Sequence, residues 1–283
     1  MKLRHPRHRF LVPDDTPMPK ATARVTHLGI GAHQDDLEFM ATHGILTCFQ
    51  DRNQWFGGIT CTDGAGSSRS GSYADYSDAE MHRVRAEEQE QAAIVGRYGF
   101  MAQLGYPSAE IKDPNRKDPV EDLAAILAAA RPAVVYTHNP TDKHGTHVAV
   151  FAKVIRGIRS LPADQRPAQL LGCEVWRGLD WMPDSEKVAL DVSGHDSLVA
   201  ALNGIFDSQI AGGKRYDLAV EGRKVANATF FDSHAADTSD RVWYAMDLTP
   251  LIQDDSRSVE EFTMGFLDRL RSSVAENLSQ FLG

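Results

Sequence analysis

Short apolar runs alternate with longer segments of helical spacing through the first 160 residues. The short runs predict buried strands at 25–31, 55–61 and 133–138. Helices are predicted after the first strand, from the capping box of Ser77 and Glu80 to about Tyr98, and from Asp118 onward. Strands and helices that alternate in this way are typical of an α/β fold.

The order of these elements favours a Rossmann-like, mostly parallel sheet with helices on both faces. In such sheets, ligands bind beyond the carboxyl ends of the strands. After about Pro162 the pattern changes, and we expect an elaborated C-terminal third. It is predicted to hold strands at 169–176, 187–192 and 241–248, a mainly helical stretch at 195–232, and a closing amphipathic helix at 258–282.

The N-terminal segment, residues 1–24, is rich in Pro, Arg and His and shows no periodicity. We expect it to lie as an arm over the surface of the folded protein. No repeat and no linker-like composition divides the rest of the chain. Residues 25–283 are therefore predicted to form a single domain.

Composition and charge restrict the classes of function. The chain has 283 residues, with 30 Lys+Arg against 39 Asp+Glu and a formal net charge of −9. This acidic balance disfavours nucleic-acid partners and favours a small-molecule substrate. Three cysteines without CxxC spacing indicate neither a disulfide framework nor a thiolate zinc site. With no signal-peptide pattern and no apolar run of about 20 residues, we expect a cytoplasmic protein without a membrane span.

Two polar clusters follow predicted strands. His33, Asp35 and Asp36 come directly after the first strand, and His144 and His147 follow the third. Taken alone, the first cluster favours a helix cap formed by an aspartate. Together, the clusters place imidazoles and carboxylates at one edge of the sheet. These are the ligands of open catalytic zinc sites, which use three protein ligands, so a mononuclear metal hydrolase is the leading hypothesis.

The same residues resemble the PIG-L (LmbE-like) family of zinc-dependent de-N-acetylases, whose members typically carry AHPDDxE and then HPDH. The corresponding segments here are GAHQDDLEF and, about 110 residues later, HGTHVAV. TCTDGAG at 60–66 is similar to the family's TDG turn, and 84–96 resembles its helix with Arg and Glu. The resemblance extends from about Val25 to Val154.

The resemblance implies a site and a mechanism. His33, Asp36 and His147 would be metal ligands, Asp35 the general base, and His144 the group that faces the oxyanion. Zinc-bound water would attack an amide carbonyl, and the amine would leave with a proton from Asp35 or His144. His144 would have to be protonated to stabilise the oxyanion by charge. Zinc is the expected ion, and Fe²⁺ or Co²⁺ can replace it.

Two departures from the family pattern affect this assignment. Gln34 stands where Pro is usual, which loosens the turn but removes no ligand. Gly145 and Thr146 replace the Pro and Asp of HPDH, which removes a carboxylate that could orient the histidines. Asp142 is a candidate substitute for that carboxylate.

Weaker signals lie in and after the loop at 62–77, which is long enough to act as a lid or to bind substrate. Arg69 in this loop and Arg85 on the next helix are candidate substrate contacts. A surface loop and a helix-surface ion pair explain these two residues equally well. Histidines without partners at ligand spacing are interpreted as structural: His43, His138, His195 and His234.

The sequence therefore predicts a zinc-dependent amidohydrolase that removes an acetyl or another short acyl group from an amino sugar or a small amino-sugar conjugate. The substrate class is implied by the resemblance alone. One alternative is a hydratase or lyase that uses the same ligands. Another, disfavoured by the spare carboxylate of Asp35, is a carbohydrate-binding relative without turnover. Oligomerisation is left open.

Overall fold

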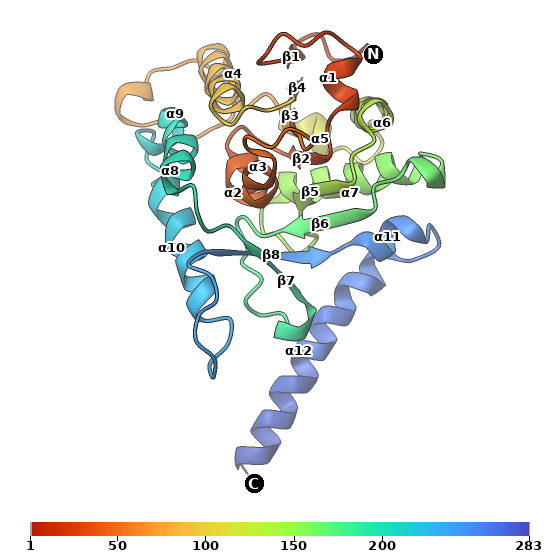
Figure 1. Ribbon diagram of the computed structural model, residues 1–283, viewed down its shortest axis with the longest axis vertical. Helices are drawn as coiled ribbons and strands as arrows, with labels where there is room; N and C mark the ends of the chain where they lie inside the picture. The colour runs from red at the N-terminus through yellow and green to blue at the C-terminus, as the bar shows by residue number, and fades with distance from the viewer. Residues whose placement is uncertain (1, 283) are drawn as a thin grey trace.

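The computed structural model describes residues 2–282, which form an eight-stranded sheet with the order β1-β4-β3-β2-β5-β6-β8-β7. Figure 1 shows the strands stacked from top to bottom in this order. The strands are β1 Arg9–Leu11, β2 His27–Gly31, β3 Phe56–Thr62, β4 Phe100–Tyr106, β5 Val134–His138, β6 Gln169–Cys173, β7 Lys187–Asp191 and β8 Val242–Asp247.

Helices cover both faces of the sheet. In Figure 1, α2, α3, α4, α8 and α10 lie on one side and α6 and α7 on the other, while α12 projects from the body. The α-helices are α1 Lys20–Ala23, α2 Asp36–Met40, α3 Thr42–Cys48, α4 Asp78–Val95, α5 Ser108–Lys112, α6 Asp118–Ala130, α7 Gly145–Arg159, α8 Asp196–Gly204, α9 Asp207–Ile210, α10 Tyr216–Thr229, α11 Thr249–Gln253 and α12 Val259–Leu282. Short 3₁₀ helices are η1 Gly71–Tyr73, η2 Ala163–Gln165 and η3 Asp184–Glu186.

The predicted fold class is confirmed. Strands β2 to β6 pair in parallel, and the three strands predicted first, now β2, β3 and β5, lie near the centre of the sheet. The capping box of Ser77 and Glu80 begins α4 as expected. In the C-terminal third, β8 pairs antiparallel with both β6 and β7, which makes that part of the sheet mixed.

Two strands were not expected from the sequence. Strand β4 is wholly buried, and the polar Gln103 interrupts its apolar run, so its pattern does not stand out. The Gln103 amide donates a hydrogen bond to the Ala86 carbonyl at 2.8 Å, which satisfies it inside the fold. Strand β1 comes from the N-terminal arm and pairs antiparallel with β4, so part of the arm is an edge strand and not only a surface segment.

The sheet buries two hydrophobic cores, one on each face. One core gathers apolar residues of α6, α7 and α11, and the other gathers residues of α2, α3, α8 and α10. A sheet covered on both faces exposes polar side chains only where its strands end. Among residues 2–282, no helix has both the length and the hydropathy needed to cross a membrane.

The pairing of β2 with β5 brings the two polar clusters together. Ile30 is aligned with Thr137, so both strands end at the same edge of the sheet. The chain then turns tightly, and a Cβ atom added to Gly31 would lie only 2.9 Å from Cβ of Asp36. Glycine at this position therefore lets α2 begin directly against the end of β2.

Candidate metal centre and active site

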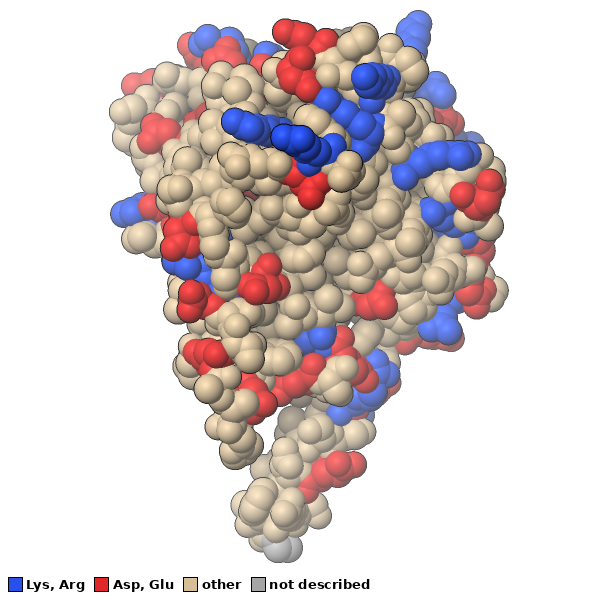
Figure 2. All heavy atoms as spheres, in the orientation of Figure 1, with Lys and Arg blue, Asp and Glu red and all other residues tan. Residues whose placement is uncertain are grey.

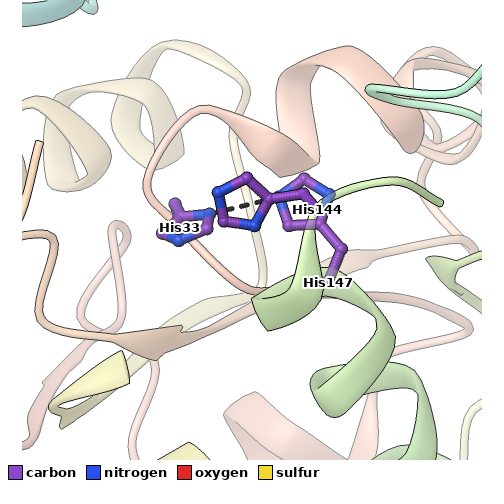
Figure 3. A group of neighbouring side chains, drawn as sticks. All are labelled: His33, His144 and His147. Atoms are coloured by element: carbon purple, nitrogen blue, oxygen red, sulfur yellow. Dashed lines mark hydrogen bonds between the residues drawn. The ribbon is translucent and has the colours of Figure 1, made fainter. Parts of the chain in front are cut away.

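His33, Asp36 and His147 converge beyond the ends of β2 and β5. Nδ1 of His33 lies 3.2 Å from Nε2 of His147 and 3.4 Å from Oδ2 of Asp36. Oδ1 of Asp36 lies 3.5 Å from Nε2 of His147. Asp36 and His147 are buried, and His33 is partly exposed. Figure 3 shows His33 and His147 facing one another, with His144 beside them.

The 3.2 Å between Nδ1 of His33 and Nε2 of His147 and the 3.4 Å between Nδ1 of His33 and Oδ2 of Asp36 are close to the spacing of two ligand atoms on a tetrahedral metal ion, and the other oxygen of Asp36, Oδ1, faces His147. Bonds of about 2.0–2.1 Å at the tetrahedral angle place ligand atoms about 3.3–3.4 Å apart. The Nδ1 of His147 lies 3.3 Å from Oδ2 of Asp142, so an N–H there donates to the carboxylate and leaves Nε2 free to coordinate. The donor set of two imidazoles and one carboxylate therefore fits zinc.

The carboxylates and histidines of the cluster shift one another's pKa values. Burial alone would lower the pKa of His147, but the carboxylates of Asp36 and Asp142 raise it above its ordinary value. Burial would raise the pKa of Asp36, but His147 and His138 hold it well below the usual range. Burial lowers the pKa of His33. Asp36 is therefore ionised and His33 neutral near pH 7, as metal coordination requires.

His138 also joins the cluster, although its sequence spacing gave no reason to expect this. Its Nε2 lies 3.3 Å from Oδ2 of Asp36, and its ring stacks on His147 with centroids 3.8 Å apart. The Ala32 N–H donates to the same Nε2 at 2.9 Å, and burial lowers the pKa of His138 to about 4. His138 is therefore a neutral ring packed against the cluster. The available signal was its position as the last residue of a strand that neighbours β2.

The other histidines follow the structural interpretation only in part. Two sets of three residues bring potential ligand atoms within 4.8 Å of one another: His33, His144 and His147, and Asp36, His138 and His147. His43 instead lies 2.8 Å from the hydroxyl of Tyr136 through Nδ1. Of the four histidines interpreted as structural, His138 is thus the one next to the candidate ligands.

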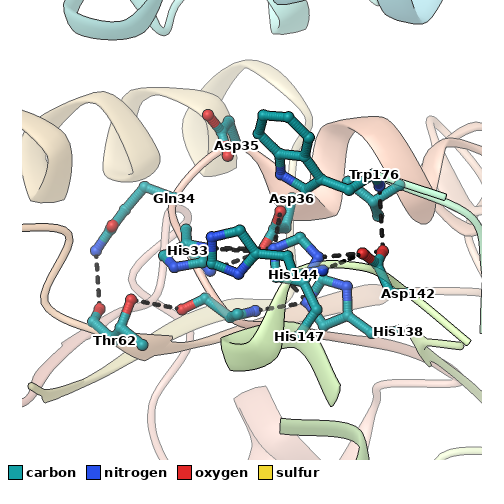
Figure 4. Close-up of polar contacts among 12 residues, drawn as sticks. His33, Gln34, Asp35, Asp36, Thr62, His138, Asp142, His144, His147 and Trp176 are labelled. Carbon is teal, nitrogen blue, oxygen red and sulfur yellow. Dashed lines mark hydrogen bonds and ion pairs between the residues drawn. The ribbon is translucent and has the colours of Figure 1, made fainter. Parts of the chain in front are cut away.

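Asp35 points away from the candidate ligands (Figure 4). Its carboxylate lies 3.1 Å from the Arg85 guanidinium, and its N–H donates to Oε1 of Gln89 at 3.2 Å. A φ of +96° is rare for a residue other than glycine and turns the two adjacent carboxylates in different directions. Burial raises the pKa of Asp35 well above its usual value; Arg85 opposes the shift and Asp36 adds to it.

His144 precedes the first residue of α7 and lies beside the candidate ligands. Its ring centroid is 5.0 Å from that of His33 and 4.6 Å from that of His147. Burial, with the neighbouring histidines, lowers the pKa of His144 to about 4, so the ring is neutral near pH 7. Asp142 accepts a hydrogen bond from the His144 backbone N–H at 2.9 Å and faces the imidazole of His147. Asp142 therefore positions both residues without contacting the His144 ring.

Gln34 ties the turn to the sheet, where the sequence suggested a looser turn. Its side chain is buried, and its amide donates to the Thr62 carbonyl at 3.2 Å and to Oε1 of Gln103 at 3.1 Å. These bonds link the segment between β2 and α2 to β3 and β4. The amide thus replaces the stiffness of a proline with hydrogen bonds.

A cavity of about 670 Å³ opens over the candidate ligands. His33, Asp35, Asp36, His144 and Arg85 line it. Figure 4 shows Trp176 above the histidines, and this residue also lines the cavity. Polar groups with altered pKa values therefore meet in one concave site, as expected for an active site.

The loop at 62–77 forms part of the cavity wall through Ser67 and Ser68. Arg69 in the same loop donates to the Ala65 carbonyl and pairs with Asp78, and it lies outside the described cavity lining. Of the two candidate substrate contacts, the structure thus brings Arg85 to the cavity and turns Arg69 to the loop's own backbone.

Comparison with known proteins gives one family. Residues 28–158 match the PIG-L family model, described as GlcNAc-PI de-N-acetylase. This range includes all three candidate ligands together with Asp35 and His144. No curated protein matches the chain.

Solved structures with a similar fold have low sequence identity to this chain. A conserved protein from Thermus thermophilus is 16% identical, with a TM-score of 0.63, and the match covers 83% of this chain and all of that one, 100%. N,N'-diacetylchitobiose deacetylase from Pyrococcus horikoshii is 14% identical, with a TM-score of 0.62 and coverage of 88% and 93%. The 4-carboxy-2-hydroxymuconate hydratase from Pseudomonas putida is 17% identical, with a TM-score of 0.60 and coverage of 79% and 96%.

At these identities the structural matches show a shared fold. The family model adds the sequence match, and its range begins within β2 and ends within α7. Both polar clusters lie inside that range. The chain therefore carries a PIG-L family domain over residues 28–158.

Proposed function

We propose that this protein is a metal-dependent hydrolase that removes an N-acetyl or another short acyl group from an amino sugar or a small amino-sugar conjugate. The PIG-L domain supports this class of reaction. The observation that carries the proposal is that two adjacent carboxylates, those of Asp35 and Asp36, face different groups. Asp36 faces His33 and His147, while Asp35 faces the cavity and Arg85.

His33, Asp36 and His147 would hold the metal, with His147 oriented by Asp142. When bound there, zinc would polarise the amide carbonyl and make a water molecule more acidic. Fe²⁺ or Co²⁺ is an acceptable replacement for this donor set.

Asp35 is proposed to move the proton. Its carboxylate would take a proton from the attacking water as the water oxygen bonds to the carbonyl carbon. The C–N bond would then break, and the same proton would pass to the departing nitrogen, giving acetate and a free amine. A pKa raised by burial suits both roles, because Asp35 must accept the proton and later return it.

His144 is proposed to donate a hydrogen bond to the carbonyl oxygen as that oxygen gains negative charge. With a pKa of about 4, the ring is a neutral donor near pH 7. Because the ring is neutral, its contribution would come from hydrogen bonding and position and not from a full charge.

Free thiols at Cys48, Cys61 and Cys173 accord with action in the reducing cytoplasm.

A hydratase is the second candidate function. The fold is similar to that of 4-carboxy-2-hydroxymuconate hydratase, and a base beside a metal could add water across an activated double bond. Such an enzyme would release neither amine nor acetate. The two functions therefore predict different products from the same residues.

The test is a panel of N-acetylated sugars, with free amine and acetate both measured and with metal analysis of the purified protein. We expect about one divalent ion per chain, equimolar amine and acetate from at least one sugar, and loss of both after chelation. Restoration by zinc would link activity to the site. A metal-loaded protein that releases no amine or acetate but hydrates an unsaturated acid would support the second candidate.

A further inference from the structure

The cavity over the candidate ligands has a charge balance opposite to that of the chain. Its described lining holds five basic side chains and two carboxylates, whereas the chain has a net charge of −9. The basic residues are Arg85, Lys112, Lys143, Lys214 and Arg223. Figure 2 shows that Lys and Arg also gather in the upper part of one face, so charge is unevenly distributed over this protein.

Both carboxylates in the lining already have partners. Asp35 pairs with Arg85, and Asp36 lies among the histidines. Within residues 2–282, the four remaining basic side chains have no carboxylate within 4.0 Å: Lys112, Lys143, Lys214 and Arg223. The described lining therefore holds more basic than acidic side chains, and four of the basic ones form no ion pair within 4.0 Å.

Two of these lysines gather around one aromatic side chain. Nζ of Lys143 lies 5.9 Å and Nζ of Lys214 lies 5.5 Å from the ring centroid of Trp176. The Trp176 ring also stacks against His144, with centroids 6.0 Å apart. We refer to Lys143, Trp176 and Lys214 as the basic wall of the cavity, and Trp176 brings this wall next to His144.

Like charges held near one another repel, and a positively charged concave surface attracts anions. The lysines come from separate segments, before α7 and between α9 and α10, so the arrangement is made by the fold and not by a local run of basic residues. Lysine binds phosphate and carboxylate as a compact point charge with three N–H donors. The indole ring of Trp176, which lies near both lysines, offers apolar surface for a sugar ring.

We propose that the substrate carries an anionic group, a phosphate or a carboxylate, that the basic wall binds while the acyl group lies over the candidate metal ligands. This deepens the proposed function and rests on it, because it assigns the charge class of the acylated substrate. Lys143 and Lys214 contact the anion, and Lys112 and Arg223 add to the positive field of the cavity. These residues are proposed to determine substrate specificity, whereas hydrolysis of the amide depends on Asp35, His144 and the candidate metal ligands.

The test compares binding of neutral and anionic sugars to the full-length, metal-loaded protein by calorimetry. The probes are N-acetylglucosamine, its 1-phosphate, its 6-phosphate and N-acetylmuramic acid, which distinguish phosphate from carboxylate and one position from another. The Asp35→Asn variant is used so that no probe is consumed. We expect at least one anionic probe to bind about tenfold or more tightly than the neutral sugar, with the difference reduced by added salt.

The lysines are then replaced singly and together by glutamine. Lys143→Gln and Lys214→Gln should each weaken binding of the preferred anionic probe by about fivefold, and the double variant by about 10-fold to 30-fold. Lys117→Gln is the matched control, because Lys117 is exposed, lies outside the cavity lining and has no ion pair with a described residue. Equal affinity for all probes, or a preference that survives the double substitution, would overturn the proposal.

Turnover separates this proposal from the proposed function. In the protein with an intact Asp35, the anionic-to-neutral ratio of kcat/KM should fall in the double lysine variant by the same factor as the binding preference. If neutral and anionic sugars release amine with the same kcat/KM, the basic wall has no role in specificity, and the proposal of deacetylase activity is still supported. If no sugar releases amine but the lysine-dependent preference persists, the anion site stands and the deacetylase proposal fails.

Discussion

The floor and the basic wall of the cavity differ in burial and in origin. The floor consists of His33 and Asp36, which line the cavity, together with His147, whose Nε2 lies 3.2 Å from Nδ1 of His33. Two of the three are buried, and all three lie within the PIG-L match over residues 28–158. In the basic wall, Lys143 and Lys214 are exposed, Trp176 is half-buried, and Trp176 and Lys214 lie beyond the family match. Buried side chains that contact one another are held in one geometry, which suits the groups that carry out the reaction. Exposed side chains in the wall can differ between proteins that act on different substrates.

The largest effect is expected for Asp36→Ala, because it removes both a candidate ligand and the negative charge that balances the cluster. Metal content should fall from about one ion per chain to nearly none, and turnover should disappear with it. Metal analysis after gel filtration and amine release measure the two effects. Retention of a full metal complement would remove Asp36 from the ligand set.

Asp35→Ala should instead separate metal binding from turnover. The variant loses the proposed base but no candidate ligand, so metal content should stay near one ion per chain while kcat falls by about 10²–10⁴. The same metal and amine assays apply. If Asp35→Ala loses the metal and Asp36→Ala keeps it, the roles of the two carboxylates are exchanged.

Asp142→Asn tests whether the Asp142 carboxylate orients the candidate ligand His147. Asparagine can still accept from the His144 N–H, but its amide can no longer act as a carboxylate partner for His147. Metal affinity should fall by about 10- to 100-fold, as for other losses of a carboxylate behind a ligating histidine. Competition with a chelator of known affinity measures it, and an unchanged constant would show that Asp142 only caps the backbone.

Acid should weaken metal binding through His147. Asp36 and Asp142 raise the pKa of this residue in the metal-free protein despite its burial, and the metal needs the neutral ring. Below that pKa, affinity should fall by about tenfold per pH unit, because one proton competes with the ion. Competition with a chelator at pH values from about 5 to 9, which include the range in which histidine titrates, measures how steeply metal affinity depends on pH.

The stability of the metal-free protein should have the complementary pH dependence. A histidine with a folded-state pKa above its unfolded value contributes fully below about pH 6.5 and loses that contribution as the pH rises through the raised value. Asp142→Asn should reduce this contribution. Urea unfolding of both metal-free proteins at several pH values would test the sign, and a stability that rises over that range would contradict the assignment to His147.

The smallest effect is expected at the loop. The Tyr73 hydroxyl donates to Asp207 at 2.7 Å, which ties the loop at 62–77 to α9. Tyr73→Phe should lower kcat/KM by about two- to tenfold without changing metal content, since one hydrogen bond is lost. Tyr76→Phe is the control, because no described residue is bonded to its hydroxyl. Equal kinetics in both variants would assign the loop no role in closure.

Much of the site could be predicted from the sequence because its residues lie close together along the chain or follow predicted strands. His33, Asp35 and Asp36 share one turn, and His144 and His147 share another. Buried parallel strands have strong apolar runs, so β2 and β5 were recognisable, and the ends of such strands meet at one edge. The roles of these residues remain predictions until the variants are measured.

Only the tertiary structure brought His138 to Asp36 and His147, and only it gathered Lys143, Trp176 and Lys214 around one cavity. Strand β4 was likewise hidden, since Gln103 finds its hydrogen bonds inside the fold. The sequence by itself determined the order of the elements and the two polar turns, because local spacing encodes both. Contacts between segments far apart in the chain depend on how the strands pair and how the loops pack, and no local pattern specifies them.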